Sequence, residues 1–128
     1  MASAQSTTVL VVDDEPSILL LCRVNLELEG FRVLEASSVP AARELLGAEQ
    51  VDVLLVDVHV GDADGRDLIR ELHEAGNTTR CALLTGTVQL TPNDRGGADD
   101  VIEKPFSLDT LISKVKRLAG DDVDSSMP

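Results

Sequence analysis

The sequence predicts an α/β fold in which helices cover both faces of one parallel β-sheet. Short apolar segments alternate along the chain with segments of helical periodicity. The apolar segments are continuous, without regular polar interruptions, which is typical of strands buried on both faces. A length of 128 residues suits a single domain. Right-handed crossovers between the parallel strands then make that domain doubly wound.

Five segments are expected to form the strands: residues 8–12, 31–36, 51–56, 81–85 and 100–104. The first (TVLVV) runs directly into charged residues. The third (VDVLLV) is the most apolar, which favours a central place in the sheet. The fourth (CALLT) is also almost wholly apolar, and the fifth (DVIEK) is short.

Four segments are expected to form helices, beginning near Pro16, Ser38, Arg66 and Ser107. Pro16 suits the first position of a helix, and Gly30 suits the left-handed residue that ends it. Ser38 can cap the second helix, which is expected to run to about Leu46 and to end at Gly47. The last helix carries a stripe of leucine, isoleucine and valine at helical spacing.

The segment between Thr85 and Lys104 is expected to contain only a short or irregular helix. It includes Pro92 and the pair Gly96–Gly97, and these residue types disfavour a helix interior.

Composition excludes several classes of protein. Lys and Arg total 11 against 23 Asp and Glu, for a net charge of −12, which repels nucleic acid and anionic lipid. Phe31 and Phe106 are the only aromatic residues, too few for a surface that stacks on bases. The two cysteines, Cys22 and Cys81, lack the spacing of a metal site with histidine. We expect no direct nucleic-acid partner.

No apolar run is long enough to cross a membrane. The polar N-terminus lacks the plan of a signal peptide, so a cytoplasmic protein is expected. We divide the chain into a flexible N-terminus (1–7), one domain (8–119) and an acidic tail or linker (120–128).

Chemically competent side chains follow four of the five predicted strands. Because the carboxyl ends of parallel strands meet at one edge of the sheet, we expect them to converge there. They are Asp13 and Asp14 after the first strand, Asp57 after the third, Thr85 at the end of the fourth and Lys104 at the end of the fifth.

Three carboxylates and one ammonium leave an excess of two negative charges, which a divalent cation would neutralise. Ligands that are all oxygens favour Mg²⁺, or Mn²⁺, over zinc. A carboxylate beside such an ion can act as a nucleophile toward phosphorus. Asp57 is the best candidate for the nucleophile because it ends the most apolar strand, and Asp13 and Asp14 are better placed to bind the metal.

With these residues in place, the chain resembles a response-regulator receiver domain of two-component signalling. The resemblance rests on VLVVDDEP, LLVDVHVGDADG, ALLTG and GADDVIEKPF, in that order, and covers about residues 8–119. It implies a flavodoxin-like fold with strand order 2-1-3-4-5. It also implies a signalling domain, not an enzyme, that catalyses only its own phosphotransfer and autodephosphorylation.

The resemblance implies a role for each residue of the site. Asp57 accepts a phosphoryl group from a sensor histidine kinase or a histidine phosphotransfer protein. Asp14, Asp57 and the main-chain carbonyl of His59 bind Mg²⁺ directly, and Asp13 holds a metal-bound water. Thr85 and Lys104 contact the phosphoryl oxygens, and no organic cofactor is expected. The Lys104–Pro105 bond is often cis in this family.

The chain departs from the family pattern at two further places. Val101 occupies a position, three residues before the lysine, where the family usually has an aromatic residue that moves with the threonine. Val60–Gly61 replaces a usual Met-Pro pair after the acceptor. The segment between Thr85 and Lys104 is also a few residues shorter than the family pattern. Because its helix and the neighbouring elements commonly form the partner surface in this family, the signal output of this chain is expected to be unusual.

Several polar residues near these motifs are expected to have ordinary roles. Arg66 and Arg70 are expected to be solvated helix residues. The His59 ring is expected to lie at a solvated rim, and Glu15 could assist the site only through water.

Other functions remain open at this point. A haloacid-dehalogenase-like phosphatase also uses an aspartate and Mg²⁺, but it needs a second aspartate where this chain has His59. A flavin-binding domain needs a donor-rich loop where this chain has acids. A receiver-like interaction domain that is never phosphorylated is a further alternative. The output partner, or an output domain outside this chain, is unknown, and a weak or phosphorylation-dependent dimer is left open.

Overall fold

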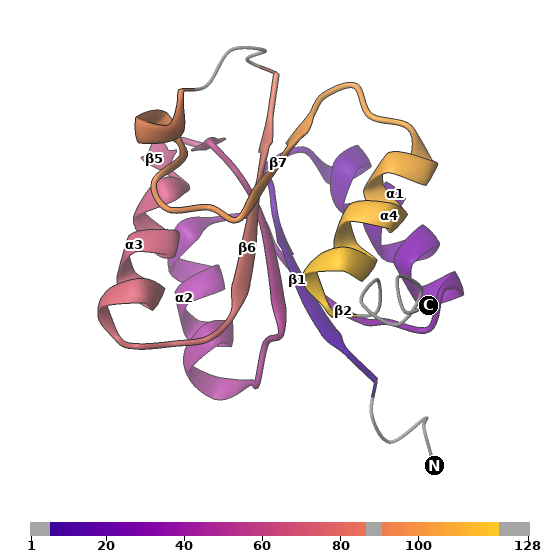
Figure 1. The fold of residues 1–128 in the computed structure, drawn as a ribbon, viewed down its shortest axis with the longest axis horizontal. Helices are drawn as coiled ribbons and strands as arrows, with labels where there is room; N and C mark the ends of the chain where they lie inside the picture. Colours follow the sequence, from indigo (N-terminus) through magenta and orange to yellow (C-terminus); the bar gives the residue numbers. More distant parts are fainter. Residues whose placement is uncertain (1–5, 87–90, 121–128) are drawn as a thin grey trace, which may run out of the picture.

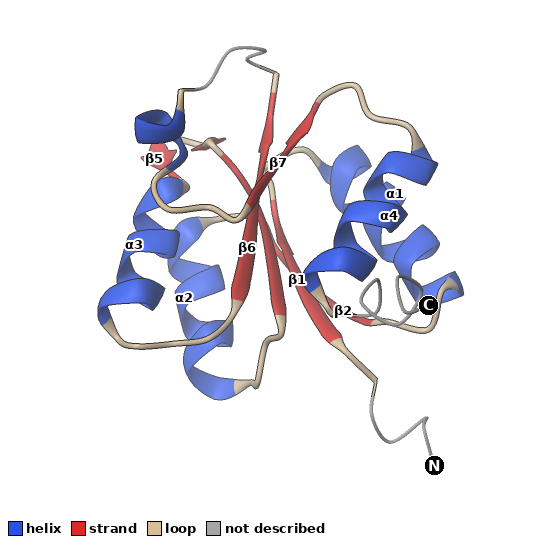
Figure 2. Ribbon diagram, in the orientation of Figure 1, coloured by secondary structure: helices blue, strands red, loops and turns tan. Residues whose placement is uncertain are grey.

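The computed structural model describes residues 6–86 and 91–120. Its centre is a five-stranded parallel sheet (Figures 1 and 2) with the order β2-β1-β3-β6-β7. The strands are β1 (Thr8–Val12), β2 (Arg32–Ala36), β3 (Val53–Asp57), β6 (Arg80–Thr85) and β7 (Asp100–Glu103). Counted along the chain, this is the predicted order 2-1-3-4-5, and the predicted fold class is confirmed.

In the described part of the chain, four α-helices cover the two faces of the sheet: α1 (Pro16–Leu28), α2 (Val39–Ala48), α3 (Arg66–Glu74) and α4 (Leu108–Leu118). Figure 1 shows α2 and α3 on one face and α1 and α4 on the other. None of the helices in the described ranges has the length and apolar character needed to cross a bilayer.

Successive side chains of a strand point to opposite faces of the sheet, so the core is divided between these two faces. Leu10 and Val12 of β1 pack in the cluster that includes the α2 and α3 side chains. Val9 and Val11 pack in the cluster that includes α1 and α4. All four side chains are fully buried. An all-apolar strand is therefore required here, because both of its faces are covered.

The helix ends follow the sequence signals in most cases. Pro16 opens α1, and Gly30 follows the helix at φ +96°. The Ser38 hydroxyl accepts a hydrogen bond from the Ala41 N–H and caps α2. The prediction that Gly47 ends this helix is wrong, because α2 continues to Ala48 and leaves through an extended residue, Glu49. An extended exit needs no left-handed residue, so no glycine is required there.

Two small elements lie between the main ones. A two-stranded antiparallel hairpin, β4 (His59–Val60) and β5 (Ala63–Asp64), follows the third strand of the sheet. The sequence predicted only a turn-rich loop there. Between β6 and β7, the described residues contain one short 3₁₀ helix, η2 (Pro92–Arg95), so the prediction of a short or irregular element is confirmed.

The prediction that Arg66 is an ordinary solvated residue is wrong. Its guanidinium donates to both carboxylate oxygens of Asp64, at 2.9 and 2.7 Å, and to the main-chain carbonyl of Asp94 at 2.7 Å. Arg66 therefore joins the hairpin to η2. Arg70 is exposed and paired with Asp67, in agreement with the prediction.

The chain segments predicted to flank the domain, 1–7 and 120–128, lie largely outside the described residues.

Candidate functional site

Strand register brings the predicted site residues to one edge of the sheet. Val12 pairs with Val56 and Asp57 pairs with Leu84, so β1, β3 and β6 end at the same level. Lys104 follows β7 directly, and its N–H donates to the carbonyl of Thr85 at 2.7 Å. The side chains that follow these strands therefore meet above one edge, as the sequence predicted.

Three carboxylates form the centre of the site. Oxygen atoms of Asp13, Asp14 and Asp57 all lie within 4.8 Å of one another. Asp13 is fully buried, Asp57 is partly buried and Asp14 is exposed. Such a set of oxygens has the size and chemistry of a site for a hard divalent cation.

Local backbone groups hold these carboxylates in place. The Asp13 N–H donates to the Ala36 carbonyl at 3.1 Å, which extends the β1–β2 ladder by one residue. The hairpin that follows Asp57 supplies two further donors. The His59 N–H donates to Asp57 Oδ1, and the Gly61 N–H donates to Asp14 Oδ2, both at 2.9 Å.

Lys104 approaches the carboxylates from the end of β7, the outer strand of the sheet next to β6. Its ammonium lies 2.6 Å from Asp57 Oδ2, 2.8 Å from Asp13 Oδ2 and 3.0 Å from Glu15 Oε1. The Lys104–Pro105 peptide bond is cis, as the resemblance implied.

Two pKa shifts describe the electrostatics of this cluster. Burial raises the pKa of the Asp13 carboxyl, although hydrogen bonds from Lys104 and the Glu15 N–H oppose the shift. Burial alone would lower the pKa of Lys104, but its hydrogen bonds to Asp13, Asp57 and Glu15 outweigh burial and raise that pKa above its usual value. The lysine therefore stays charged and partly neutralises the acids.

Two residues at this site were missed or misjudged from the sequence. Glu15 pairs directly with Lys104, whereas only a water-mediated role was expected. Gly65 lies against the acceptor strand: a Cβ there would fall 2.0 Å from the Asp57 carbonyl oxygen and 2.7 Å from Val56 Cγ2. A glycine among turn residues gives no signal of such close approach, because strand and helix meet there only in the folded chain.

The remaining residues singled out from the sequence lie on β6, on the hairpin and on β7. Thr85 is buried at the end of β6. His59 is exposed on the hairpin, as expected of its ring, and the role of its carbonyl stays a prediction. Val101 is half-buried, and its carbonyl accepts a hydrogen bond from Lys114 at 2.6 Å.

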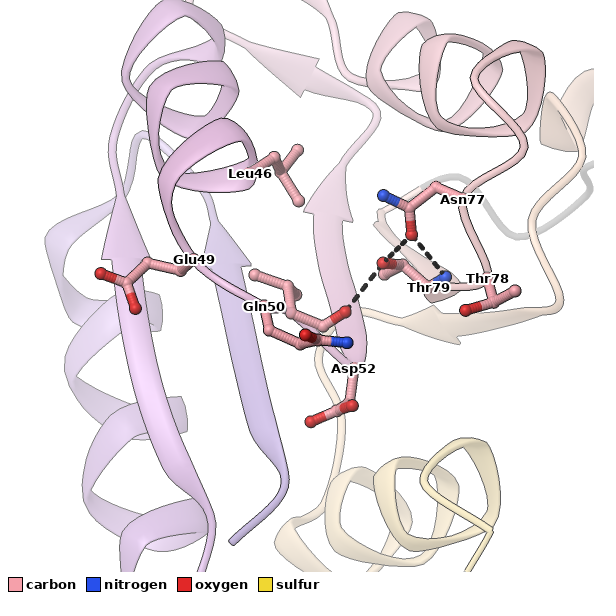
Figure 3. Close-up of a pocket in the computed structure, with 8 residues that line it drawn as sticks. Leu46, Glu49, Gln50, Asp52, Asn77, Thr78 and Thr79 are labelled. Atoms are coloured by element: carbon pink, nitrogen blue, oxygen red, sulfur yellow. Dashed lines mark hydrogen bonds between the residues drawn. The ribbon is translucent and has the colours of Figure 1, made fainter. Parts of the chain in front are cut away.

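A separate pocket of about 290 Å³ lies at the opposite edge, where β3 and β6 begin. Figure 3 shows the Asn77 amide and Thr79 on one side of it and Leu46 and Gln50 on the other. The Thr79 hydroxyl and N–H both lie within hydrogen-bonding distance of Asn77 Oδ1, and the hydroxyl also lies 2.8 Å from the Val51 carbonyl. These contacts hold the loop before β6 in place.

The fold and the acid–lysine cluster define a class: a doubly wound α/β domain with an oxygen-rich site at the carboxyl edge of its sheet. The chain belongs to the response regulator receiver domain family, because residues 9–116 match the family model. It is thus a receiver domain of two-component signalling. The family match also favours this class over the phosphatase and flavin-binding alternatives.

The relatives agree with this assignment. The C4-dicarboxylate transport transcriptional regulatory protein DctD of Pseudomonas aeruginosa is 37% identical over 117 residues, which cover 87% of this chain and 25% of that protein. The transcriptional regulatory protein TrcR of Mycobacterium tuberculosis is 32% identical over 120 residues, covering 91% and 47%. This chain therefore spans between about a quarter and a half of the length of these relatives.

A solved structure agrees as well. The crystal structure of a response regulator from Thermotoga maritima is 36% identical and superimposes with a TM-score of 0.81. The match covers 90% of this chain and 98% of that chain.

Proposed function

We propose that Asp57 accepts a phosphoryl group from a sensor histidine kinase or a histidine phosphotransfer protein. The observation that carries this proposal is the pairing of the Asp57 carboxylate with Lys104 at 2.6 Å beside two further aspartates. A carboxylate at a cationic, partly enclosed site is a suitable nucleophile toward phosphorus.

In this transfer, one carboxylate oxygen of Asp57 forms a bond to phosphorus. The bond between phosphorus and the donor's leaving atom breaks, and the leaving group keeps the electron pair. Lys104 and the hydroxyl of buried Thr85 then donate hydrogen bonds to the new phosphoryl oxygens. Their position at the ends of two adjacent strands supports these roles.

Asp13, Asp14, Asp57 and the His59 carbonyl would hold Mg²⁺, or Mn²⁺. The fit rests on an all-oxygen donor set with atoms within 4.8 Å of one another, which suits a small, hard cation. When bound, the ion supplies positive charge that stabilises the transferring phosphoryl oxygens.

The phosphorylated domain is expected to change its affinity for an output partner, and its own catalysis is limited to phosphotransfer and autodephosphorylation. A covalent phosphoryl group shifts a two-state surface by its differential interactions with the two states. The output partner is a separate protein, a domain of a longer chain or a second copy of this domain. Sedimentation velocity with and without phosphorylation tests the last of these.

Intact-mass spectrometry after treatment with acetyl phosphate and Mg²⁺ tests the central proposal. The wild type should gain the mass of one phosphoryl group, and Asp57→Asn should gain none while keeping cooperative unfolding. Asp52→Asn, at the opposite edge, serves as the control and should be modified like the wild type. No adduct on the wild type, or an undiminished adduct on Asp57→Asn, would overturn the proposal.

A further inference from the structure

The Lys104 ammonium makes as many carboxylate contacts as it has N–H donors. A protonated lysine has three N–H donors and no acceptor. In this structure, three carboxylates surround it, at 2.6 Å for Asp57, 2.8 Å for Asp13 and 3.0 Å for Glu15. A phosphoryl oxygen on Asp57 can therefore receive a hydrogen bond from Lys104 only if one of these carboxylates gives up its own.

The three carboxylates differ in the free energy that breaking their contact with Lys104 would cost. The Asp13 side chain is 0% exposed, so its release would leave a buried charge without its cationic partner. Asp57 is 13% exposed and is the group that is modified. The Glu15 side chain is 58% exposed, and an exposed carboxylate can turn into water at little cost.

The backbone of Glu15 is fixed while its side chain is free to turn. Its N–H donates to Asp13 Oδ1 at 2.9 Å, and its carbonyl accepts from the N–H groups of Ile18 and Leu19 at the start of α1. Among the described residues, its carboxylate pairs with Lys104 alone. Glu15 is thus anchored beside the site but can release the lysine without disturbing the fold.

We propose that Glu15 is a positioning residue for phosphoryl transfer: it holds the third N–H of Lys104 while Asp57 is unmodified, and yields that N–H to a phosphoryl oxygen. This inference rests on the proposed function. In the unmodified state, Glu15 keeps the ammonium fixed between Asp13 and Asp57. During transfer, its negative charge competes with the incoming phosphoryl group for the same donor.

Glu15→Gln is the direct test, because the amide keeps the size of the side chain and removes the charge. We expect Glu15→Gln to bind beryllofluoride, a phosphoryl mimic, about three- to tenfold more tightly than the wild type in the presence of Mg²⁺. Amide NMR titration measures the dissociation constant. Urea denaturation should show an unchanged free energy of unfolding, which separates positioning from a structural role.

Glu29→Gln is the matched control. It removes one negative charge at the other end of α1, where Glu29 pairs with Lys116 at 2.9 Å. Residues 15 and 29 are separated by the whole of α1, a distance at which salt screens the charge. Glu29→Gln should therefore bind beryllofluoride as the wild type does, and an equal gain in both variants would overturn the proposal.

A crystal structure of the wild-type beryllofluoride complex gives a second readout. Lys104 should contact the bound mimic, and the Glu15 carboxylate should lie beyond hydrogen-bond distance of the ammonium. A retained Glu15–Lys104 bond, or unchanged affinity in Glu15→Gln, would overturn this inference while leaving the proposed function intact. Failure of the wild type to bind the mimic or to accept phosphate would instead overturn the proposed function, and the inference with it.

Discussion

The two edges of the parallel sheet are both rich in polar side chains, but they use them differently. At the amino edge, polar groups meet backbone groups: Asp52 accepts from the Thr8 N–H at 2.8 Å, and the Thr79 hydroxyl lies 2.8 Å from the Val51 carbonyl. At the carboxyl edge, Asp13, Asp14 and Asp57 face one another.

This difference separates stability from function. A side chain that satisfies a buried backbone group stabilises the fold. Carboxylates within 4.8 Å repel each other by about 3.5 kcal/mol per pair at an effective dielectric near 20. A cluster that opposes folding in this way is typical of a binding or catalytic site. Both edges carry polar side chains, but among the described residues only the carboxyl edge groups three like charges. This grouping therefore identifies the carboxyl edge as the functional one.

The largest expected loss of stability comes from adding a side-chain atom at Gly65, which lies against the Asp57 backbone. Gly65→Ala would place a Cβ 2.0 Å from the Asp57 carbonyl oxygen, so backbone must move. We expect a loss of about 3 kcal/mol or more in the free energy of unfolding, measured by urea denaturation, since overpacking against rigid atoms is destabilising.

Gly47→Ala is the control for this variant. Gly47 lies within α2 and a Cβ there meets nothing within 4 Å. Alanine should stabilise the helix by about 0.5–1 kcal/mol. A similar loss in both variants would show that the contact between Gly65 and Asp57 is unimportant.

Lys104→Met should reveal how strongly the acids of the carboxyl edge repel each other. Without the ammonium, buried Asp13 loses its cationic partner. We expect a loss of about 2 kcal/mol in unfolding free energy, less than for a fully buried pair because the lysine is partly exposed. Added Mg²⁺ should raise the unfolding free energy of this variant more than that of the wild type. A ligand that binds only the folded state stabilises that state. Equal Mg²⁺ responses would contradict a shared metal and lysine site.

Thr79→Val tests the opposite edge. It removes a buried hydroxyl that lies 2.8 Å from the Val51 carbonyl, with little change in shape. The free energy of unfolding should fall by about 1–2 kcal/mol, because that carbonyl loses its hydroxyl partner. The rate of modification by acetyl phosphate, followed by intact mass, should not change. A slowed rate would show that the two edges are not independent.

The pH dependence of stability should differ between wild type and Asp13→Asn. Burial raises the pKa of the Asp13 carboxyl. A raised folded-state pKa contributes stability below the unfolded-state pKa, and this contribution is lost as the pH rises through the folded-state pKa. Measured by urea denaturation without Mg²⁺, the wild type should therefore lose stability relative to Asp13→Asn as the pH rises from about 4.

Thr79→Val provides the comparison for this experiment, because it removes no titrating group. Its stability difference from the wild type should stay constant over the same pH range. A constant difference for Asp13→Asn as well would contradict a raised pKa at Asp13.

The sequence by itself determined the fold class and predicted which strand-end side chains converge at the carboxyl edge. Apolar strands that end in Asp13, Asp57, Thr85 and Lys104 can only deliver those side chains to one edge of a parallel sheet. The same local patterns predicted the cap at Ser38 and the start of a helix near Ser107. These features depend on the spacing of apolar residues and on single residues at helix starts, and both can be identified in the sequence.

Only the tertiary structure decided which side chains reach across the domain. Glu15 meets Lys104, 89 positions away, and Arg66 meets the Asp94 carbonyl, 28 positions away. The contact between Gly65 and Asp57 likewise exists only once strand and helix are docked. Such contacts are set by the distance between folded elements and by the rotamers of long side chains, and neither leaves a periodic signal in the sequence.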